Sequence, residues 1–595
     1  MNVRIGSKRG QGNSLSASKG FTMSFWFLVT LTLVLGLTGW SSHAARLGLD
    51  AGDVVYRTIA ALFFGGPYDT ASLWESDWRL SVARLSGLLA FVIAASKAAM
   101  VLLSSHWVRR RAQRRSGHRV LVGDDALVER IARMALARGE TVHRFCAPMG
   151  SSSDDTPGLF VVPGSWDLEQ AKRYGLTRAA SVIVSMRDEV ATMAIARTIR
   201  GEVGEDEVPV RINIRSPWLV RRIGEQEKVI GIGLFSEARL GVRRIQRRHP
   251  PYLVARNLGH GRLHVVVVGF GLHGEAVMIE TLLSSLVSYL DRPLLTIVDP
   301  NATAIRCDLA MKYPEIDKSV DIVPVDGTVQ GGGGALSEEA LHAIANPYPV
   351  TFAYICLPDD SVGLSAGLAL QGLALRAGWT RGPIFVRLRA SGAILQADPG
   401  TGSLEPAQLL GFGETEEVVA EIGAFGDEVD RLARLFHDGY REVAVGEGAA
   451  KVDWGDLTED YRDSNRRLVL HMPAMVSSAG FDIEPWVRAI HANPDDPPLP
   501  SAGRHVAEPS RQETLAVLEH ERWMADRRLN GWSYGATRDN ELRKHPDLVP
   551  FAELCEPSKS YDLKMIEMLA RCLEAAEDER AGRARAPDVP WWERH

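Results

Sequence analysis

A twenty-residue stretch without one charged side chain, FTMSFWFLVTLTLVLGLTGW at residues 21–40, constrains this chain more than any other feature. As a helix, a stretch of this length spans the hydrocarbon core of a bilayer. Residues 1–20 before it are basic. A basic start followed by an apolar run is also the pattern of a cleaved signal peptide, and that alternative stays open. We expect a basic cytoplasmic N-terminus over residues 1–20 and a transmembrane helix over residues 21–40.

A second apolar stretch, residues 80–107, predicts a second transmembrane helix. It is followed by RRRAQRR at residues 109–115, and positive charge flanks the cytoplasmic end of membrane helices. Both ends of the chain are therefore expected inside, with residues 41–79 as an external loop. The expected location is the inner (plasma) membrane, as a multi-pass protein whose N-terminus and C-terminal domains are cytoplasmic.

The external loop resembles a pore segment. Residues 53–64 have a helical pattern too short to span, and GGPYD follows. A long helix, a short helix, a glycine turn and a second long helix are the plan of a two-helix cation-channel pore. The filter sequence TVGYG is absent, so a plain connector remains the alternative. The pore candidates are Gly65, Gly66, Tyr68 and Lys97, of which Lys97 faces either a pore or the cytoplasmic interface.

From residue 118 onward, strand-like and helix-like patterns alternate, which predicts two tandem Rossmann-like α/β domains with parallel sheets at 118–255 and 261–400. The first is degenerate, because Gly123 is followed by two aspartates that would repel a pyrophosphate. The second has Gly269, Gly271 and Gly274 as GxGxxG between a strand and a helix, with Phe270 in the same loop. Asp299 ends the next strand. These residues predict NAD(H) or an adenine nucleotide as a regulatory ligand; the alternative is that the glycines serve packing alone.

Both α/β domains resemble RCK domains, the regulators of potassium conductance. The resemblance is carried by the stretch at 161–198, by PVDGTV at 324–329 and by TFAYICLPDDSVGLSAGLAL at 351–370, whereas GGGG at 331–334 departs from the family pattern. It adds Asp326 and Asp359 to the candidate nucleotide ligands. RCK domains form rings beneath a pore and couple ligand binding to gating. The resemblance therefore implies a homotetramer, or a dimer as the smallest stable unit.

Residues 425–577 are mostly helical in pattern, followed by a tail at 578–595. The stretch at 515–554 closely resembles the ryanodine-receptor repeat domain, with the motif carried by His520, Trp523, GWSYG at 531–535 and KHPDLVPF at 544–551. An internal repeat supports this resemblance. It pairs residues 432–440 with 515–523, 454–457 with 551–554, and 464–480 with 560–576. The first copy lacks GWxYG, so we do not expect the two copies to be equivalent.

The repeat motif predicts a ligand pocket with aromatic and cationic side chains. Aromatic faces stack on a planar base, and Lys or His neutralises a phosphate. The candidate residues are Trp523, Trp532, Tyr534, Lys544 and His545. The alternative is that the tryptophans belong to the core and that Lys544-His545-Pro546 is a capping turn.

The fold class expected from the whole sequence is multidomain: two transmembrane helices, two Rossmann-like domains and a helical C-terminal domain. The main functional hypothesis is a ligand-gated, channel-like membrane protein of the potassium or cation transport type, which senses a nucleotide or nucleotide-derived signal. A non-conducting membrane-anchored sensor or scaffold is the second hypothesis, and an NAD(P)-dependent membrane enzyme is the third. No nucleophile–base pair or metal-ligand spacing stands out, so we expect no catalysis and no metal site. The net charge of −6 argues against nucleic-acid binding.

Overall fold

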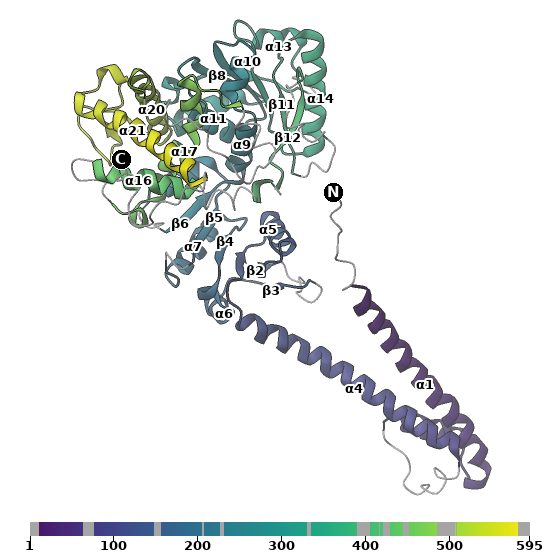
Figure 1. Ribbon diagram of the computed structural model, residues 1–595. Helices are drawn as coiled ribbons and strands as arrows, with labels where there is room; N and C mark the ends of the chain where they lie inside the picture. Colours follow the sequence, from purple (N-terminus) through teal and green to yellow (C-terminus); the bar gives the residue numbers. More distant parts are fainter. Residues whose placement is uncertain are drawn as a thin grey trace. The chain divides into compact units, whose positions relative to one another are not determined.

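The computed structural model separates into two units, Met1–Arg114 and Arg115–His595 (Figure 1). It describes residues 11–63, 77–147, 156–204, 208–226, 231–329, 335–389, 395, 405–415, 417–419, 429–443, 452–484, 506 and 508–580. The pore candidates Gly65, Gly66 and Tyr68 and the glycine run at 331–334 lie outside the described residues.

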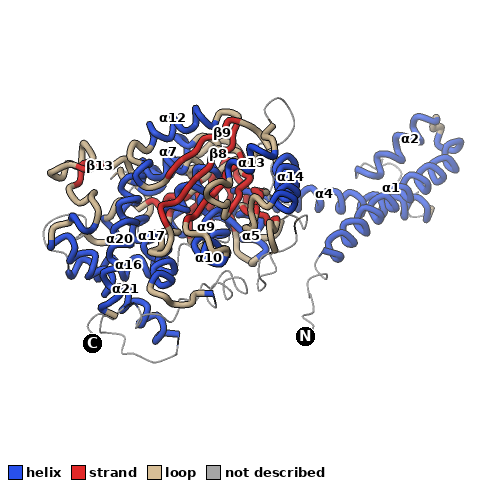
Figure 2. Tube along the Cα trace, turned by 90° about the horizontal axis from the view of Figure 1, so that it is seen from above, coloured by secondary structure: helices blue, strands red, loops and turns tan. Residues whose placement is uncertain are grey.

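The first unit contains the two predicted apolar helices, α1 (Gln11–Leu47) and α4 (Trp78–Gln113). The parts long and apolar enough to cross a membrane are Met23–Leu47 and Trp78–Ala98. Between them, α2 (Ala51–Ala60) and the short 3-10 helix η1 (Ala61–Phe63) occupy the place of the short helix predicted over 53–64, and Figure 2 shows α2 beside α1. The hydroxyls of Thr32 and Ser86 form a buried 2.8 Å hydrogen bond between α1 and α4. Lys97 is exposed on α4, and its role stays a prediction.

The second unit contains two six-stranded parallel sheets, as the sequence predicts. The order in the first is β3 (Leu159–Pro163), β2 (Val142–Ala147), β1 (Arg119–Val122), β4 (Ser181–Val184), β5 (Val210–Asn213) and β6 (Ile232–Phe235). The order in the second is β12 (Leu409–Phe412), β11 (Ile384–Arg387), β10 (Phe352–Ile355), β7 (Arg262–Val268), β8 (Asp291–Asp299) and β9 (Asp321–Asp326). Numbered within its own domain, each sheet has the doubly wound order 3-2-1-4-5-6. The last strand, β12, extends the second domain beyond the predicted boundary at residue 400.

Helices cover both faces of the second sheet, whose strands are drawn in red in Figure 2. Along β7, Val265 and Val267 pack on the side of α9 (Glu237–Arg248), α11 (Leu272–Ser284) and α12 (Ala302–Lys312). Val266 and Val268 pack on the side of α13 (Glu338–Ile344) and α14 (Asp360–Ala377). This alternation is what a parallel sheet buried on both faces requires. The remaining helices of the two α/β domains are α5 (Ala126–Ala137), α6 (Leu168–Arg173), α7 (Glu189–Arg200), α8 (Pro217–Gly224) and α10 (Pro251–Asn257).

The C-terminal region repeats one order of elements: helix, 3-10 turn, helix. The first copy is α16 (Asp430–Val443), η8 (Trp454–Asp456) and α17 (Glu459–Ser478); the second is α20 (Pro509–Leu529), η9 (Phe551–Glu553) and α21 (Glu556–Arg580). The second copy also carries the short strands β13 (Ser533–Tyr534) and β14 (Lys544–His545). One hydrophobic core joins both copies, and α17 and α20 contact α11 (Figure 1).

The structure corrects the predicted alignment of the repeat by one residue. Trp454 and Phe551 begin the two 3-10 turns, and Glu459 and Glu556 begin the helices that follow, so the offset between the copies is 97 residues here. The predicted pairing of 464–480 with 560–576 has an offset of 96. The difference matters because a shift of one residue turns a helical side chain by about 100° about the axis.

Candidate functional site

The helical region contains a cavity of about 430 Å³ that is lined by both repeat copies. His437 of α16 and His520 of α20 are equivalent residues within it. The Nε2–H of His437 donates to the carbonyl oxygen of Val452 at 2.8 Å, and the Nε2–H of His520 donates to that of Val549, also at 2.8 Å. The two copies therefore share a local geometry, although the sequence analysis expects them not to be equivalent.

Fourteen of the lining residues form seven equivalent pairs, with one member of each pair from each copy. In the first helix of each copy the offset is 83 residues, and from the 3-10 turn onward it is 97. The pairs are His437 and His520, Tyr440 and Trp523, Leu457 and Leu554, Tyr461 and Ser558, Ser464 and Tyr561, Asn465 and Asp562, and Leu468 and Met565. The cavity is thus a product of pairing the copies, and a single copy would supply half of this lining.

The second copy alone supplies the rest of the lining. These residues are Glu519, Arg522, Arg527, Trp532, Arg538, His545, Pro546 and Asp547. Several of them belong to the loop that separates α20 from η9, where β13 and β14 pair. The cavity is therefore pseudo-symmetric in its walls and asymmetric in its charged groups.

Two buried arginines, Arg522 and Arg527, line the cavity. Arg522 uses Nε and Nη2 on the carboxylate of Glu519, at 2.8 and 2.7 Å, while its buried Nη1 has no hydrogen-bond partner among the described residues. The Nε of Arg527 is likewise buried and without a partner there. An unsatisfied buried N–H costs free energy, and more when the group is charged. Such a donor gains from any acceptor that comes within hydrogen-bonding distance.

The structure brings together three of the five residues predicted for this pocket. Trp523, Trp532 and His545 line the cavity, whereas Tyr534 and Lys544 are not among its lining residues. The Nζ of Lys544 instead donates to the Ser533 hydroxyl at 2.7 Å, and the Tyr534 side chain is exposed. The cavity lining therefore includes the cationic side chains of Arg522 and Arg527 and not that of Lys544, and Arg527 lies 5.8 Å from the centre of the Tyr461 ring.

Trp532 both lines the cavity and packs into a buried apolar cluster. It is only 8% exposed and belongs to a small apolar cluster with Met524 and Leu548, with Trp523 packed against it. The alternative interpretation, that the tryptophans belong to the core, therefore holds for much of the Trp532 ring. Trp523 is less buried and stacks on His520, with ring centroids 5.5 Å apart.

Sequence reasoning missed the contribution of the first copy. Tyr440 and Tyr461 line the cavity, yet neither belongs to the GWxYG or KHPxLxPF motif. The internal repeat contained the signal, because Tyr440 stands three residues after His437 as Trp523 stands three residues after His520. On a helix, residues three apart share a face.

The two equivalent histidines differ in their acid partner. Nδ1 of His520 lies 3.1 Å from Oδ2 of Asp562, whereas the first copy has Asn465 at the position equivalent to Asp562. Burial is the largest influence and opposes the charged form of His520. The hydrogen bonds to Asp562 and to the Val549 carbonyl, together with the charges of Asp562 and Asp547, outweigh it, so the pKa of His520 is raised. Burial lowers the pKa of His437. One histidine is thus prepared to carry charge and the other to stay neutral.

We expect this ion pair to make stability depend on pH. Because the pKa of His520 is raised in the folded state, its stabilising effect is complete below the unfolded-state value of about 6.5 and is lost as pH rises through the folded-state pKa. The melting temperature of the wild type should exceed that of Asp562→Asn most at pH about 6 and least at about 8.5. Melting curves of both proteins across this range test it; a gap that widens with pH would contradict it. Asp317→Asn, at an exposed ion pair, is the control.

In the glycine loop of the second α/β domain, one of the three glycines leaves room for a phosphate to approach the backbone. A Cβ on Gly271 would meet nothing within 4 Å, and this residue stands at the N-cap of α11. Gly269 has φ +81°, and a Cβ there would lie 2.8 Å from Leu357. A Cβ on Gly274 would lie 3.1 Å from Phe270 and from Val267. Gly269 and Gly274 therefore serve conformation and packing, while Gly271 leaves open space.

The predicted acidic ligands near this loop are already engaged by the chain itself. Oδ2 of Asp299 accepts from the backbone N–H of Phe270 at 3.0 Å, which holds the glycine loop against β8. Asp326 accepts from the N–H and the hydroxyl of Thr303, and Asp359 caps α14 by accepting from Ser361 and Val362. These carboxylates shape the loops. A ligand would have to share or displace those hydrogen bonds.

A comparison with protein families agrees with the resemblance found in the C-terminal region. Residues 508–577 match the RyR domain family. This region covers the second repeat copy from the start of α20 to three residues before the end of α21. Solved structures similar to this chain include ADP-bound GsuK (16% identity, 69% of this chain and 99% of that chain, TM-score 0.34) and the NAD-bound GsuK channel (12%, 68% and 84%, 0.32). The human SLO3 gating ring is another (10%, 53% and 84%, 0.37). At these scores, the fold assignment depends on the strand order of the two sheets and not on the matches.

Proposed function

We propose that this chain is a membrane protein whose cytoplasmic part senses a nucleotide or nucleotide-derived ligand in the cavity between its two helical repeats. The observation that carries the proposal is the lining of that cavity. Trp523, Tyr440 and Tyr461 offer aromatic surfaces. The buried arginines Arg522 and Arg527 each have one N–H group without a hydrogen-bond partner among the residues that the structure describes. A planar ring with a phosphate or another anionic group matches both features.

The size and charge of the cavity support a small ligand. A volume of about 430 Å³ falls in the range of small-molecule sites. Its acids are already paired: Glu519 with Arg522, and Asp562 with His520. Oδ2 of Asp547 accepts from the Ser558 hydroxyl at 3.1 Å. What remains for an anion is Nη1 of Arg522 and Nε of Arg527, which have no hydrogen-bond partner among the described residues.

The connection to the membrane unit supports a sensor that acts on its helices. The helix α4 ends at Gln113 and β1 begins at Arg119, so only five residues join the second apolar helix to the first α/β domain. We propose the inner membrane as the location, cytoplasmic placement of residues 115–595, and a homotetramer or dimer as the assembly, with ligand-dependent channel gating as the output.

A binding experiment tests the proposed site against the glycine loop. Full-length protein in detergent is titrated with ADP and with NAD by calorimetry. Tyr440→Ala and Trp523→Ala should each weaken binding about 10- to 100-fold, the effect of losing one stacking surface. Tyr534→Ala, an exposed aromatic residue outside the cavity, is the matched control and should leave affinity unchanged.

Gly271→Val distinguishes the second candidate site. The open space around Gly271 lets the fold survive the substitution, while a Val side chain would block phosphate at the N-cap of α11. Loss of binding in Gly271→Val with normal binding in Tyr440→Ala would move the ligand to the α/β domain. Absence of ADP and NAD binding in the wild type would reject both as ligands.

Conductance separates the channel from the non-conducting sensor. The purified protein is reconstituted in planar bilayers and recorded with and without the ligand that binds. Ligand-dependent current, absent from Tyr440→Ala, is expected for a channel. Normal ligand binding without current would favour the membrane-anchored sensor.

A further inference from the structure

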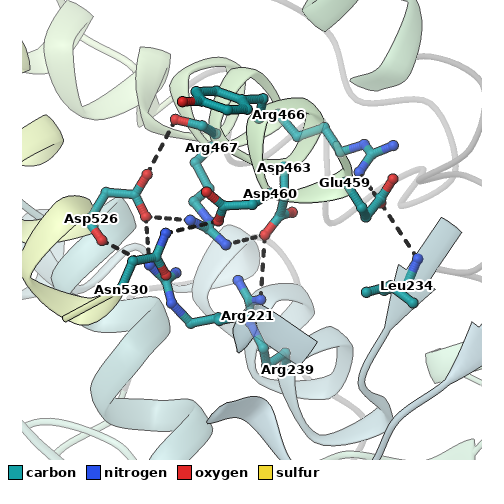
Figure 3. A network of polar contacts seen from close by, with 12 residues as sticks. Arg221, Leu234, Arg239, Glu459, Asp460, Asp463, Arg466, Arg467, Asp526 and Asn530 are labelled. Atoms are coloured by element: carbon teal, nitrogen blue, oxygen red, sulfur yellow. Dashed lines mark hydrogen bonds and ion pairs between the residues drawn. The ribbon is translucent and has the colours of Figure 1, made fainter. Parts of the chain in front are cut away.

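A network of buried charges joins the helical repeats to the first α/β domain (Figure 3). Its centre is Asp526 on α20, which is fully buried. Nη2 of Arg221, on α8, donates to both the carboxylate and the backbone carbonyl of Asp526, at 2.8 Å each. Arg467, on α17, pairs with the same carboxylate. Burial would raise the pKa of Asp526, but these guanidinium groups hold it well below its ordinary value, so the group is charged.

The network continues without a break to the second α/β domain. Arg467 also pairs with Asp463, and Oδ2 of Asp463 lies 3.5 Å from Nη1 of Arg239 on α9. Arg239 and Arg243 then pair with Glu280 of α11, at 2.5 and 2.8 Å. The network thus connects α20 and α17 of the repeats with α8, α9 and α11.

The network and the cavity share two residues. Nη2 of Arg527 lies 3.5 Å from Asp460 and 3.5 Å from Asp526, and the hydroxyl of Ser464 donates to Oδ2 of Asp526 at 3.2 Å. Arg527 and Ser464 also line the cavity. A charge placed beside Arg527 therefore acts directly on the central carboxylate, through a medium that screens it weakly.

Stability alone is a poor explanation for this arrangement. Burying many charges costs desolvation, and well-packed apolar residues of similar volume are often at least as stabilising. A set of charges that several helices share does, however, respond to any change in one of its members. That is the property a transmission element needs.

We propose that this network transmits occupancy of the cavity to α8 of the first α/β domain, an inference that rests on the proposed function. An anion that pairs with Arg527 draws it away from Asp526. Asp526 is then left to Arg221 and Arg467, so α8 and α17 bind α20 more tightly. Ligand binding should therefore stabilise α8, although α8 has no residue in the cavity lining.

Amide hydrogen exchange of full-length protein in detergent, with ADP as the probe, tests the proposal. In the wild type, saturating ADP should slow exchange in residues 217–224 at least threefold. Arg221→Met removes the contact between α8 and Asp526 outside the cavity. It should abolish the slowing while ADP affinity stays within threefold of wild type. Arg306→Met, at an exposed ion pair, is the matched control and should behave as wild type.

The outcomes separate this inference from the proposed function. Unchanged exchange in α8 with ADP bound to the wild type, or full slowing in Arg221→Met, would overturn the transmission. If ADP does not bind the wild type, the comparison is made without ligand. Arg527→Gln then mimics removal of Arg527 from the network and should change the amide exchange rate of α8 at least threefold relative to the wild type. An unchanged exchange rate in α8 would overturn the inference. If Arg221→Met does not fold, Arg221→Lys replaces it and should reduce the slowing; undiminished slowing would count against the network.

Discussion

Replacing Asp526 by Ala should lower the free energy of unfolding of the helical region by about 3–5 kcal/mol, the range for removing one partner of a buried ion pair. The carboxylate is fully buried and is shared by Arg221, Arg467 and Arg527. Without it, three guanidinium groups lose their common partner in a region of low dielectric constant. Urea unfolding of the full-length protein, followed by tryptophan fluorescence, measures the loss.

The control for this experiment is an ion pair at the surface. Asp317→Ala removes the partner of Arg306, where the Asp317 side chain is 61% exposed, and should cost no more than about 1 kcal/mol. Equal losses for Asp526→Ala and Asp317→Ala would mean that the buried network carries little energy. Asp526→Asn, which keeps the shape of the side chain, should fall between wild type and Asp526→Ala.

Truncating Trp532 to Ala should destabilise the helical region by about 3–5 kcal/mol, as for other buried large aromatic side chains. Its ring is 8% exposed and packs with Met524 and Leu548, so the truncation leaves a void beside the cavity. Lys544→Ala removes a hydrogen bond to Ser533 and should cost about 1 kcal/mol, with little effect on ligand affinity. Melting temperature and ADP affinity are measured for both variants.

This pair of variants decides between the predicted pocket and the observed one. If Trp532 and Lys544 both contact the ligand with exposed side chains, as a pocket built on the sequence motif would have them, both variants should bind more weakly and melt as the wild type does. The structure predicts a large melting loss for Trp532→Ala and a nearly silent Lys544→Ala. Weaker binding in Lys544→Ala at a normal melting temperature would restore Lys544 as a ligand residue.

The sequence by itself predicted the fold class. Each feature that carried the prediction is a local pattern, and each predicts a local structure. These features are the uncharged run at 21–40, the alternation of strand-like and helix-like segments with GxGxxG, and the GWxYG motif. The structure confirms the two apolar helices, the two parallel sheets and the repeated helical elements. The structure departs from the prediction at β12. This strand pairs with β11 and so joins the second sheet, although the sequence before it has no clear pattern.

The tertiary structure decided which side chains meet. The cavity walls combine residues 83 or 97 positions apart, and the contact of Arg221 with Asp526 joins residues separated by 305 positions. Nothing in the pattern around Arg221 distinguishes it from a solvent-exposed helical arginine, because charge periodicity reports a helix face and not its partner. Likewise, Asp299 matches a ribose-binding acid in sequence, and only the fold shows its carboxylate occupied by the Phe270 N–H. Local propensity therefore determined the elements, while long-range packing determined the site, since burial and charge pairing depend on residues that the chain brings together only when it folds.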